Sequence, residues 1–317
     1  MCARLEAAEG ASDRALAEAR VLISEAEAHD GSSPVSDQAV LAAAQGQRAL
    51  LRFSEAGGAA GEAAAPVAIG IIGQGEIDLA VRPSERGRGI GSAALAQTLA
   101  RADGELRAWA HGENPAAEAL LSRAGFAPVR SLFRMALDPA LLPSDGRDPL
   151  AVPAPSGLRL RAFDPERPAD AGAWVRANAA AFATHPEQGR ITEADFALMR
   201  QEPWFEPSDL ILLAEDPGAE LAGSTWIKTV RGDDEVECEL YAVGVRPEHA
   251  GRGLGRLLLD VTLARMAQHS PDRVTLYVDG ENERAVRLYE HASFTVDSRS
   301  RQWARPASSG VDDTMDA

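Results

Sequence analysis

Cysteine and histidine are both scarce in this chain of 317 residues. The two cysteines, Cys2 and Cys238, lie far apart, and the six histidines form neither an HxxxH nor an HExxH pattern. A disulfide framework needs several cysteines, and a zinc site needs closely spaced cysteine and histidine ligands. We therefore expect neither a disulfide-stabilised scaffold nor a bound metal.

Long apolar runs and an excess of positive charge are missing as well. No stretch of about 18 apolar residues occurs, so we expect no segment that spans a membrane. The first residues lack an apolar signal core and soon become acidic, which favours a cytoplasmic location. The formal net charge of −16 would repel a nucleic acid. These features favour a cytoplasmic monomer that acts on a small molecule.

An internal repeat is the most informative feature that is present. Residues 81–91 (VRPSERGRGIG) recur as residues 245–255 (VRPEHAGRGLG), 164 positions later. A second block, residues 113–126, recurs as residues 281–294 at an offset of 168. Two blocks at nearly equal offsets indicate that a whole domain has been duplicated.

The segment between the copies is rich in proline. Residues 138–157 contain five prolines, a density that neither a helix nor a central strand tolerates. We expect this segment to link an N-terminal domain (residues 1–137) to a C-terminal domain (residues 158–304). The acidic, aperiodic residues 305–317 are expected to form a disordered tail.

Hydrophobic periodicity predicts the same order of elements in both copies, βααβββαβαβ, although a leading strand is not evident in the first. In the second copy, strands are predicted at residues 158–163, 209–214, 221–230, 235–245, 273–278 and from 294, and helices at 168–182, 192–201, 253–267 and 283–291. In the first copy, helices are predicted at residues 11–28, 89–101 and 115–124, and strands at 49–53, 66–72, 76–81 and 105–110.

The strongest motif is a strand that runs into a glycine-rich loop and then into a helix. Glycine lets the backbone approach a ligand closely, and the free N–H groups of the helix start form an anion site suited to a pyrophosphate. Arg86, Arg88 and Arg252 add positive charge. The alternative interpretation is a tight turn that needs glycine only for its backbone conformation. The occurrence of the same loop in both copies argues against that interpretation. The loop lacks the Lys-Ser/Thr of a Walker loop and does not follow a first strand, so neither a P-loop nor a Rossmann site fits.

This loop after the fourth strand, followed by an asparagine and a short helix that ends in tyrosine, resembles the Gcn5-related N-acetyltransferase (GNAT) superfamily in both halves. The resemblance implies an α/β protein of two tandem domains, each a mixed, mostly antiparallel sheet flanked by helices, with acetyl-CoA as co-substrate and no metal. It implies coenzyme contacts by Leu79, Ala80, Val81, Gly87, Arg88, Gly89, Ile90, Gly91 and Ser92 in the first copy. In the second copy it implies contacts by Val243, Gly244, Val245, Ala250, Gly251, Arg252, Gly253, Leu254, Gly255, Arg256, Asn282 and Arg287. The second copy departs from the pattern at Ala250, where Gln or Arg is usual.

Two further residues distinguish the copies and make the second one the expected catalytic domain. Tyr289 lies two helical turns after Asn282 and can give its proton to the departing thiolate, whereas Leu121 stands at its place in the first copy. Glu239, spaced evenly from Val243 and Val245, is expected to share their strand face and to accept the proton of the incoming amine. Its expected counterpart in the first copy is Gly75.

The acceptor is suggested by a narrower resemblance, carried by residues 178–189, 202–205, 226–228, 239–245 and 276–278. These segments closely resemble an actinobacterial branch of the superfamily that acetylates the cysteinyl amine of a glucosaminyl-inositol thiol precursor, Cys-GlcN-Ins. This resemblance implies that the acceptor is contacted by Asp37, Glu187, Lys228, Glu239 and Tyr277.

Plainer interpretations stay open for several of these residues. Glu187 and Lys228 can be ordinary surface charges, and Glu239 can belong to a solvated acidic strand face. The protein can instead acetylate another amine, such as an aminoglycoside or a protein N-terminus, or be a non-catalytic sensor that binds acyl-CoA. A covalent acetyl-cysteine route is not favoured, because Cys238 has no neighbouring base and is expected to be a small buried apolar residue.

Overall fold

The computed structural model describes residues 4–55, 65–102, 104–183, 188–215, 220–232 and 235–307, apart from the side chain of residue 37. The first copy contains β1 (Leu5–Glu9), α1 (Asp13–Asp30), α2 (Asp37–Ala44), β2 (Ala49–Glu55), β3 (Ala68–Gly73), β4 (Glu76–Val81), α3 (Ile90–Leu99), β5 (Leu106–Ala110), α4 (Pro115–Arg123) and β6 (Ala127–Leu137). The second contains β7 (Leu158–Ala162), α5 (Pro168–Ala181), α6 (Glu193–Met199), β8 (Leu210–Glu215), β9 (Leu221–Arg231), β10 (Val236–Val245), α7 (Leu254–His269), β11 (Arg273–Asp279), α8 (Glu283–Glu290) and β12 (Thr295–Arg305).

The predicted order of elements is found in both copies. The first copy does possess a leading strand, β1, whose five residues, LEAAE, gave no clear signal because they lack regular alternation and β-branched or aromatic side chains. It becomes a strand because it pairs along its whole length with β2. The predicted tail from residue 308 onward lies outside the described residues, and no helix within the described ranges is long and apolar enough to cross a membrane.

The chain forms two compact units, and their limits differ from those of the two sequence copies at the last strand of each copy. Unit 1 comprises residues 1–132, 279–281 and 298–317, and unit 2 comprises residues 133–278 and 282–297. The sheet of unit 1 therefore has the order β1-β2-β3-β4-β5-β12, and that of unit 2 has the order β6-β11-β10-β9-β8-β7. Each copy thus gives part of its last strand to the unit built from the other copy: residues 133–137 of β6 belong to unit 2, and residues 298–305 of β12 belong to unit 1. The domain limits predicted from the sequence, residues 1–137 and 158–304, describe the two copies and remain a prediction.

The exchanged strands are packed into the cores that receive them. Met135 and Leu137 of β6 are buried in the core of unit 2. Trp303 of β12 is buried in the core of unit 1, where β12 pairs with β5 from Arg301 to Arg305. In each unit the sheet is mostly antiparallel, with one parallel pair, β4–β5 or β10–β11, among the described strands.

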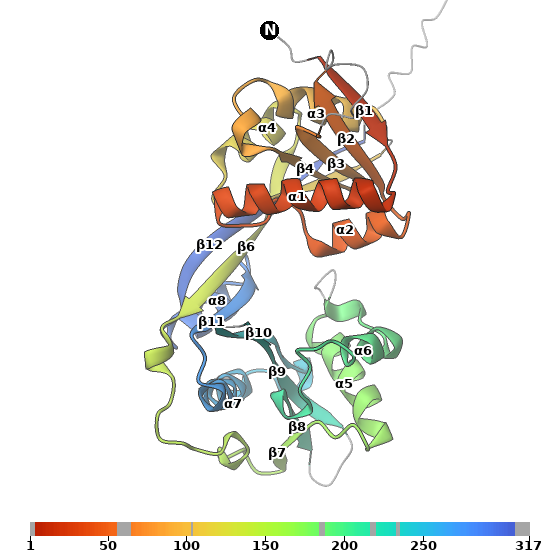
Figure 1. Cartoon of the computed structure of the whole chain (residues 1–317). Coiled ribbons are helices and arrows are strands. Elements are labelled where there is room, and N and C mark those ends of the chain that lie inside the picture. The colour runs from red at the N-terminus through yellow and green to blue at the C-terminus, as the bar shows by residue number, and fades with distance from the viewer. Residues whose placement is uncertain are drawn as a thin grey trace, which may run out of the picture. The chain divides into compact units, whose positions relative to one another are not determined.

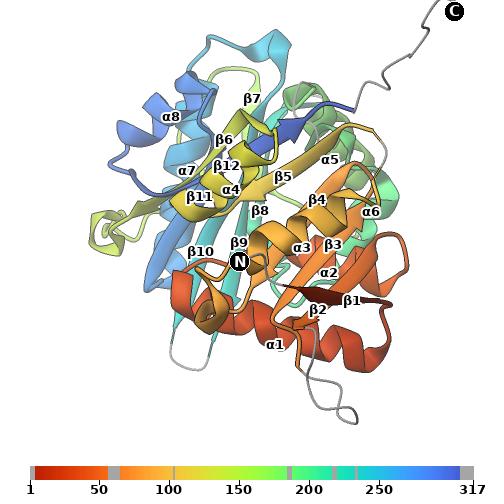
Figure 2. The same ribbon diagram turned by 90° about the horizontal axis from the view of Figure 1, so that it is seen from above.

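Helices cover both faces of the unit 2 sheet, with α5 and α6 on one side and α7 on the other (Figure 1). The α5–α6 side is aromatic: Trp174 stacks on Phe196 with 4.3 Å between ring centroids, and both meet Trp226 of β9 edge-on. The α7–α8 side is mainly aliphatic. Unit 1 is layered in the same way, with α1 and α2 against one face and α3 and α4 against the other (Figure 2). Each sheet thus has two buried faces, and the loops at its strand ends remain accessible.

Candidate active site

The parallel strands β10 and β11 part in the middle of the unit 2 sheet. They pair from Glu237 with Arg273 to Leu240 with Leu276, and the described strands show no pairing between them beyond that point. β10 nevertheless runs on to Val245. The backbone N–H and C=O groups on this edge of β10 are therefore available to a ligand.

The loop after β10 enters helix α7 with free backbone donors. Gly251 and Gly253 both have φ of 77°, a left-handed conformation that favours glycine, and an added Cβ at either would meet no atom within 4 Å. Gly253 is the N-cap of α7 and offers no side-chain cap. The first N–H groups of α7 thus remain free to bind an anion, aided by the helix dipole.

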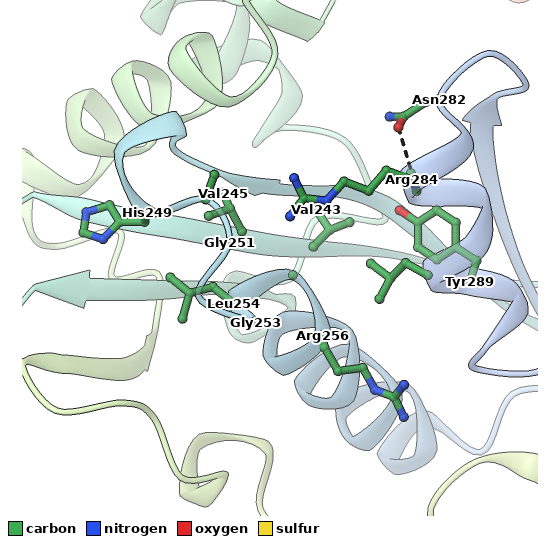
Figure 3. Close-up of a pocket in the computed structure, with 14 residues that line it drawn as sticks. Val243, Val245, His249, Gly251, Gly253, Leu254, Arg256, Asn282, Arg284 and Tyr289 are labelled. Carbon is green, nitrogen blue, oxygen red and sulfur yellow. Dashed lines mark hydrogen bonds between the residues drawn. The ribbon is translucent and has the colours of Figure 1, made fainter.

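A cavity of about 450 Å³ lies between the free edge of β10, this loop and helix α8 (Figure 3). Most of the coenzyme contacts predicted in the second copy line it, but the prediction missed His249, Arg284, Ala285 and Leu288. The lining residues are Val243, Val245, His249, Ala250, Gly251, Gly253, Leu254, Gly255, Arg256, Asn282, Arg284, Ala285, Leu288 and Tyr289.

Three residues predicted to contact the coenzyme do not line the cavity. A side chain at Gly244 would point at α5, because an added Cβ would lie 2.9 Å from Ala181. Arg287 pairs with Glu283 along the exposed side of α8, at 2.9 Å. Arg252 donates a hydrogen bond to Nδ1 of His249 at 2.8 Å, so it stands behind a residue that does line the cavity.

His249 compensates in part for the unusual alanine at position 250. Its Nδ1 accepts from Arg252, so its Nε2 carries the proton and donates to Glu215 at 2.9 Å. A fixed imidazole and a guanidinium therefore stand at the loop where the family pattern has one long polar side chain. The repeat contains a sign of the role of His249. An imidazole stands at position 249, where the first copy has the carboxylate of Glu85.

Tyr289 is buried at the end of α8, with its ring against Phe294. Figure 3 shows its phenol oxygen pointing from α8 toward Val243 on β10, into the cavity. Burial raises the pKa of Tyr289 above its ordinary value of 10, so the hydroxyl keeps its proton at neutral pH. A protonated donor therefore faces the free edge of β10.

A β-bulge between Leu240 and Ala242 changes which side chains of β10 share a face. Even spacing predicted that Glu239 lies on the face of Val243 and Val245, and this prediction is wrong. The bulge adds one residue, so Leu240 and Val243 both pack into the core beside α7. Glu239 consequently lies on the opposite face, and a bulge of this kind leaves no clear mark in the sequence.

Glu239 and Tyr289 therefore flank the place where β10 and β11 part, one on each face of the sheet. Burial raises the pKa of Glu239, the charge of Lys228 lowers it, and Glu237 raises it further. The net result is a carboxylate more basic than an ordinary glutamate. A substrate held in the opening can thus meet a proton acceptor from one face and a proton donor from the other.

Two of the predicted acceptor contacts, Lys228 and Tyr277, share the face of Glu239. Lys228 of β9 lies directly opposite Glu239 in the antiparallel pair. Burial and the charge of Glu239 raise the pKa of Tyr277, whereas the charge and hydrogen bond of Arg134 lower it. Arg134 comes from the exchanged strand β6, which is why sequence patterns did not point to it.

Glu187 lies outside the described residues, as does the side chain of Asp37.

The counterpart of Glu239 in the first copy is Glu76, and the prediction of Gly75 is wrong by one residue. Glu239 pairs with Lys228 across the strand pair, and Glu76 pairs with Gly73 at the matching step of β4. The bulge in β10 shifts the alignment, and β4 shows no such shift against β3. Glu76 forms an ion pair with Arg48 at 3.2 Å, so it already has a partner.

The glycine loop of unit 1 has the same backbone form but neutralised charges. Arg86 donates two hydrogen bonds to Asp30, at 2.7 and 2.8 Å. Arg88 pairs with both Glu55 and Glu85. The other predicted contacts of this copy lie at the end of β4 (Leu79, Ala80, Val81), in the left-handed turns (Gly87 and Gly89, φ 77° and 81°) and at the start of α3 (Ile90, Gly91, Ser92).

Cys238 is fully buried in the core of unit 2, as expected for a small apolar residue. Burial raises the pKa of its thiol to about 11. A thiol in that state is almost entirely protonated at neutral pH and is a poor nucleophile. Cys238 is therefore not suited to carry an acyl group in a covalent intermediate.

Comparisons with known proteins agree with this geometry. The profile of the acetyltransferase (GNAT) family matches residues 27–126 and 176–294, once in each copy. A solved GCN5-related N-acetyltransferase from Sphaerobacter thermophilus is 22% identical and shares the fold with a TM-score of 0.66, covering 96% of this chain and 97% of that one. A tandem GNAT protein from the clavulanic acid biosynthesis pathway is 19% identical, with a TM-score of 0.64, covering 97% of this chain and all of that one. The expected fold, an α/β protein of two GNAT-type domains, is confirmed.

Curated relatives are considerably more similar in sequence. The mycothiol acetyltransferase of Kineococcus radiotolerans is 44% identical over 280 residues, which cover 87% of this chain and 88% of the relative. That of Thermobispora bispora is 40% identical and covers 93% of this chain and 97% of the relative. The chain therefore belongs to the acetyltransferase (GNAT) family and, within it, to the family of the mycothiol acetyltransferases.

Proposed function

We propose that this protein transfers the acetyl group of acetyl-CoA to the cysteinyl amine of Cys-GlcN-Ins and so forms mycothiol. The observation that carries the proposal is the arrangement in unit 2, where Glu239 and Tyr289 flank the start of a free strand edge that leads to an anion-binding loop. The identity of the acceptor rests on the relatives described above, which bear the name mycothiol acetyltransferase.

The residues of the cavity suit coenzyme A. Its pyrophosphate needs backbone donors and positive charge, which the start of α7 offers together with Arg284. Its pantetheine arm carries amide groups, which match the open backbone groups of β10 between Tyr241 and Val245. The apolar part of the arm can lie against Leu288 of α8.

The reaction then needs two proton transfers. Glu239 accepts a proton from the ammonium group of the acceptor, directly or through a water molecule, and an α-amine with a pKa near 8 is within reach of such a base. The amine nitrogen forms a bond to the acetyl carbon, while a backbone N–H near Val243 stabilises the charge on the carbonyl oxygen. As the carbon–sulfur bond breaks, Tyr289 gives its proton to the thiolate.

We infer that unit 1 does not catalyse this reaction. The buried Leu121 replaces the proton donor, and the arginines of its glycine loop are already paired with carboxylates. Glu76, at the place of the base, is paired with Arg48. The unit contributes strand β6 to unit 2 through the exchange.

Purified protein, acetyl-CoA and a panel of amines test the proposal directly. The panel contains Cys-GlcN-Ins, GlcN-Ins without the cysteine, an aminoglycoside and a peptide with a free N-terminus, and mass spectrometry follows the acetylated products. We expect Cys-GlcN-Ins to be the only member of the panel that is acetylated efficiently. Preference for another amine would reject the acceptor, and acetyl-CoA binding without any transfer would favour a sensor.

A further inference from the structure

Lys228 and Glu239 stand directly opposite each other on neighbouring strands but do not form an ion pair. They are cross-strand partners in the β9–β10 ladder, and both lie on the face that α5 and α6 cover. Side chains in such positions start about 5 Å apart at Cβ, well within reach of an ion pair. Within the described residues, however, no atom of the Lys228 ammonium lies within 4.0 Å of the Glu239 carboxylate.

The ammonium group of Lys228 instead approaches an aromatic ring. Its Nζ lies 5.5 Å from the centroid of the Trp204 ring, which is the geometry of a cation–π contact. The contact competes with an ion pair because a single ammonium cannot take both positions. Trp204 thus diverts the nearest cation from the carboxylate.

Trp204 is well placed to hold this position. It lies in the segment between α6 and β8, and its ring packs against Tyr241 at 5.3 Å and Trp226 at 5.5 Å between centroids. Tyr241 is the residue at the bulge of β10, and Trp226 precedes Lys228 by two positions on the same face of β9. The ring is therefore clamped by the same two strands that carry Lys228 and Glu239.

The other charged groups on this face do not replace Lys228. Glu237 accepts a hydrogen bond from Thr275 at 3.0 Å and carries the same charge as Glu239. Tyr277 is uncharged at neutral pH, and Arg134 behind it is paired with Asp297. Among the charged groups on this face, Lys228 is thus the one whose position opposes the effect of burial on the basicity of Glu239.

We propose that Trp204 is a positioning residue: its ring keeps the Lys228 ammonium out of an ion pair with Glu239, so the carboxylate stays free to accept the proton of the acceptor amine. The same contact presents the ammonium to the hydroxyl groups of the acceptor. This inference rests on the proposed function, because it assumes that Glu239 is the base.

The test measures the pKa of Glu239 in the full-length protein by ¹³C NMR of labelled glutamate, with Glu239→Gln to assign the signal. Trp204→Leu and Trp204→Met both remove the aromatic face, and Trp204→Phe retains one. Because an ion pair would then form, we expect the Leu and Met variants to lower the pKa of Glu239 by about one unit. The Phe variant is expected to stay close to the wild type, and circular dichroism checks that each variant folds.

Lys228→Met provides the decisive background. Lys228→Met alone is expected to raise the pKa of Glu239 above the wild-type value, because the ammonium group is gone. A second substitution at Trp204 should then cause no further change in that pKa. An unchanged pKa in Trp204→Leu and Trp204→Met, or an equal shift with and without Lys228, would overturn the proposal. This readout needs no turnover, so a failure of the proposed function would be seen separately, as absent acetyl transfer by the wild type.

Discussion

At the scale of single residues, the two groups proposed to transfer protons, Glu239 and Tyr289, differ in how their surroundings prepare them. Tyr289 lies in an apolar environment that keeps its proton in place, and Glu239 lies on a face where burial outweighs the charge of Lys228. Both shifts suit their roles, since the acid must be protonated and the base must be basic at neutral pH. The residue types followed from the sequence, but the face of Glu239 did not, because the bulge beside Tyr241 reverses the alternation of side chains.

Replacing Tyr289 by Phe is expected to lower kcat by roughly 100-fold or more, the usual contribution of a positioned general acid. Only the hydroxyl is lost, so packing against Phe294 is retained and the affinity for coenzyme A should hardly change. Steady-state kinetics and calorimetric titration with coenzyme A measure the two quantities. An undiminished kcat would remove Tyr289 from the mechanism.

The pH dependence of kcat is expected to show the raised pKa of Glu239. The base acts only when deprotonated, so kcat should fall about tenfold for each pH unit below that pKa. Because burial raises the pKa, this fall should begin above 4.5, the ordinary value of a glutamate. Glu239→Gln should lower kcat and abolish this acidic limb. A limb that persists unchanged in the variant would assign it to another group.

At the scale of elements, the site depends on how β10 and α7 are held. The start of α7 is prepared by two left-handed glycines, a feature that the repeat motif indicated correctly. Its end is anchored by the buried Asp209, which accepts hydrogen bonds from Arg265 and His269 at 2.7 Å each. Sequence analysis did not single out this network, because its members are more than 50 positions apart and belong to no motif.

Replacing Asp209 by Asn is expected to reduce the free energy of unfolding by about 3 kcal/mol, since it removes the buried carboxylate that pairs with the partly buried Arg265 and accepts a hydrogen bond from His269. Burial alone would raise the pKa of Asp209, but His269 and Arg265 together lower it below its ordinary 3.8. The stabilisation is therefore complete above pH 3.8 and is lost as the pH falls through the lower, folded-state value. Urea unfolding at several pH values measures this difference.

Asp260→Asn is the matched control, because Asp260 pairs with Arg256 on the exposed side of the same helix. Such a surface pair contributes at most about 1 kcal/mol. Equal losses in the two variants would show that the Asp209 network does not anchor α7.

At the scale of the whole molecule, the two copies are linked by the exchange of their last strands. Sequence analysis identified the duplication and the order of elements from periodicity and repeated motifs. It could not identify the exchange, because strand partners are decided by packing between distant segments. The result is that neither copy contains all the strands of one unit.

A fragment of residues 138–317 is therefore expected not to fold. It lacks Met135 and Leu137, which are buried in the core of unit 2, and burial of each contributes about 1.5–3 kcal/mol. A fragment that starts at residue 127 retains β6 and is expected to fold and to unfold cooperatively on heating. Circular dichroism during heating compares the two, and equal cooperative transitions would contradict the role of β6.

The most direct test of the central claim, that chemistry occurs in unit 2, compares the two glycine loops by one matched substitution. Gly87 and Gly251 share φ of 77° and open space around an added Cβ, so alanine causes the same backbone strain of about 1–2 kcal/mol at either site. Acetylation of Cys-GlcN-Ins is followed by mass spectrometry at limiting acetyl-CoA. We predict that Gly251→Ala lowers the rate roughly tenfold and that Gly87→Ala leaves it nearly unchanged. Loss of activity in Gly87→Ala with full activity in Gly251→Ala would contradict the account.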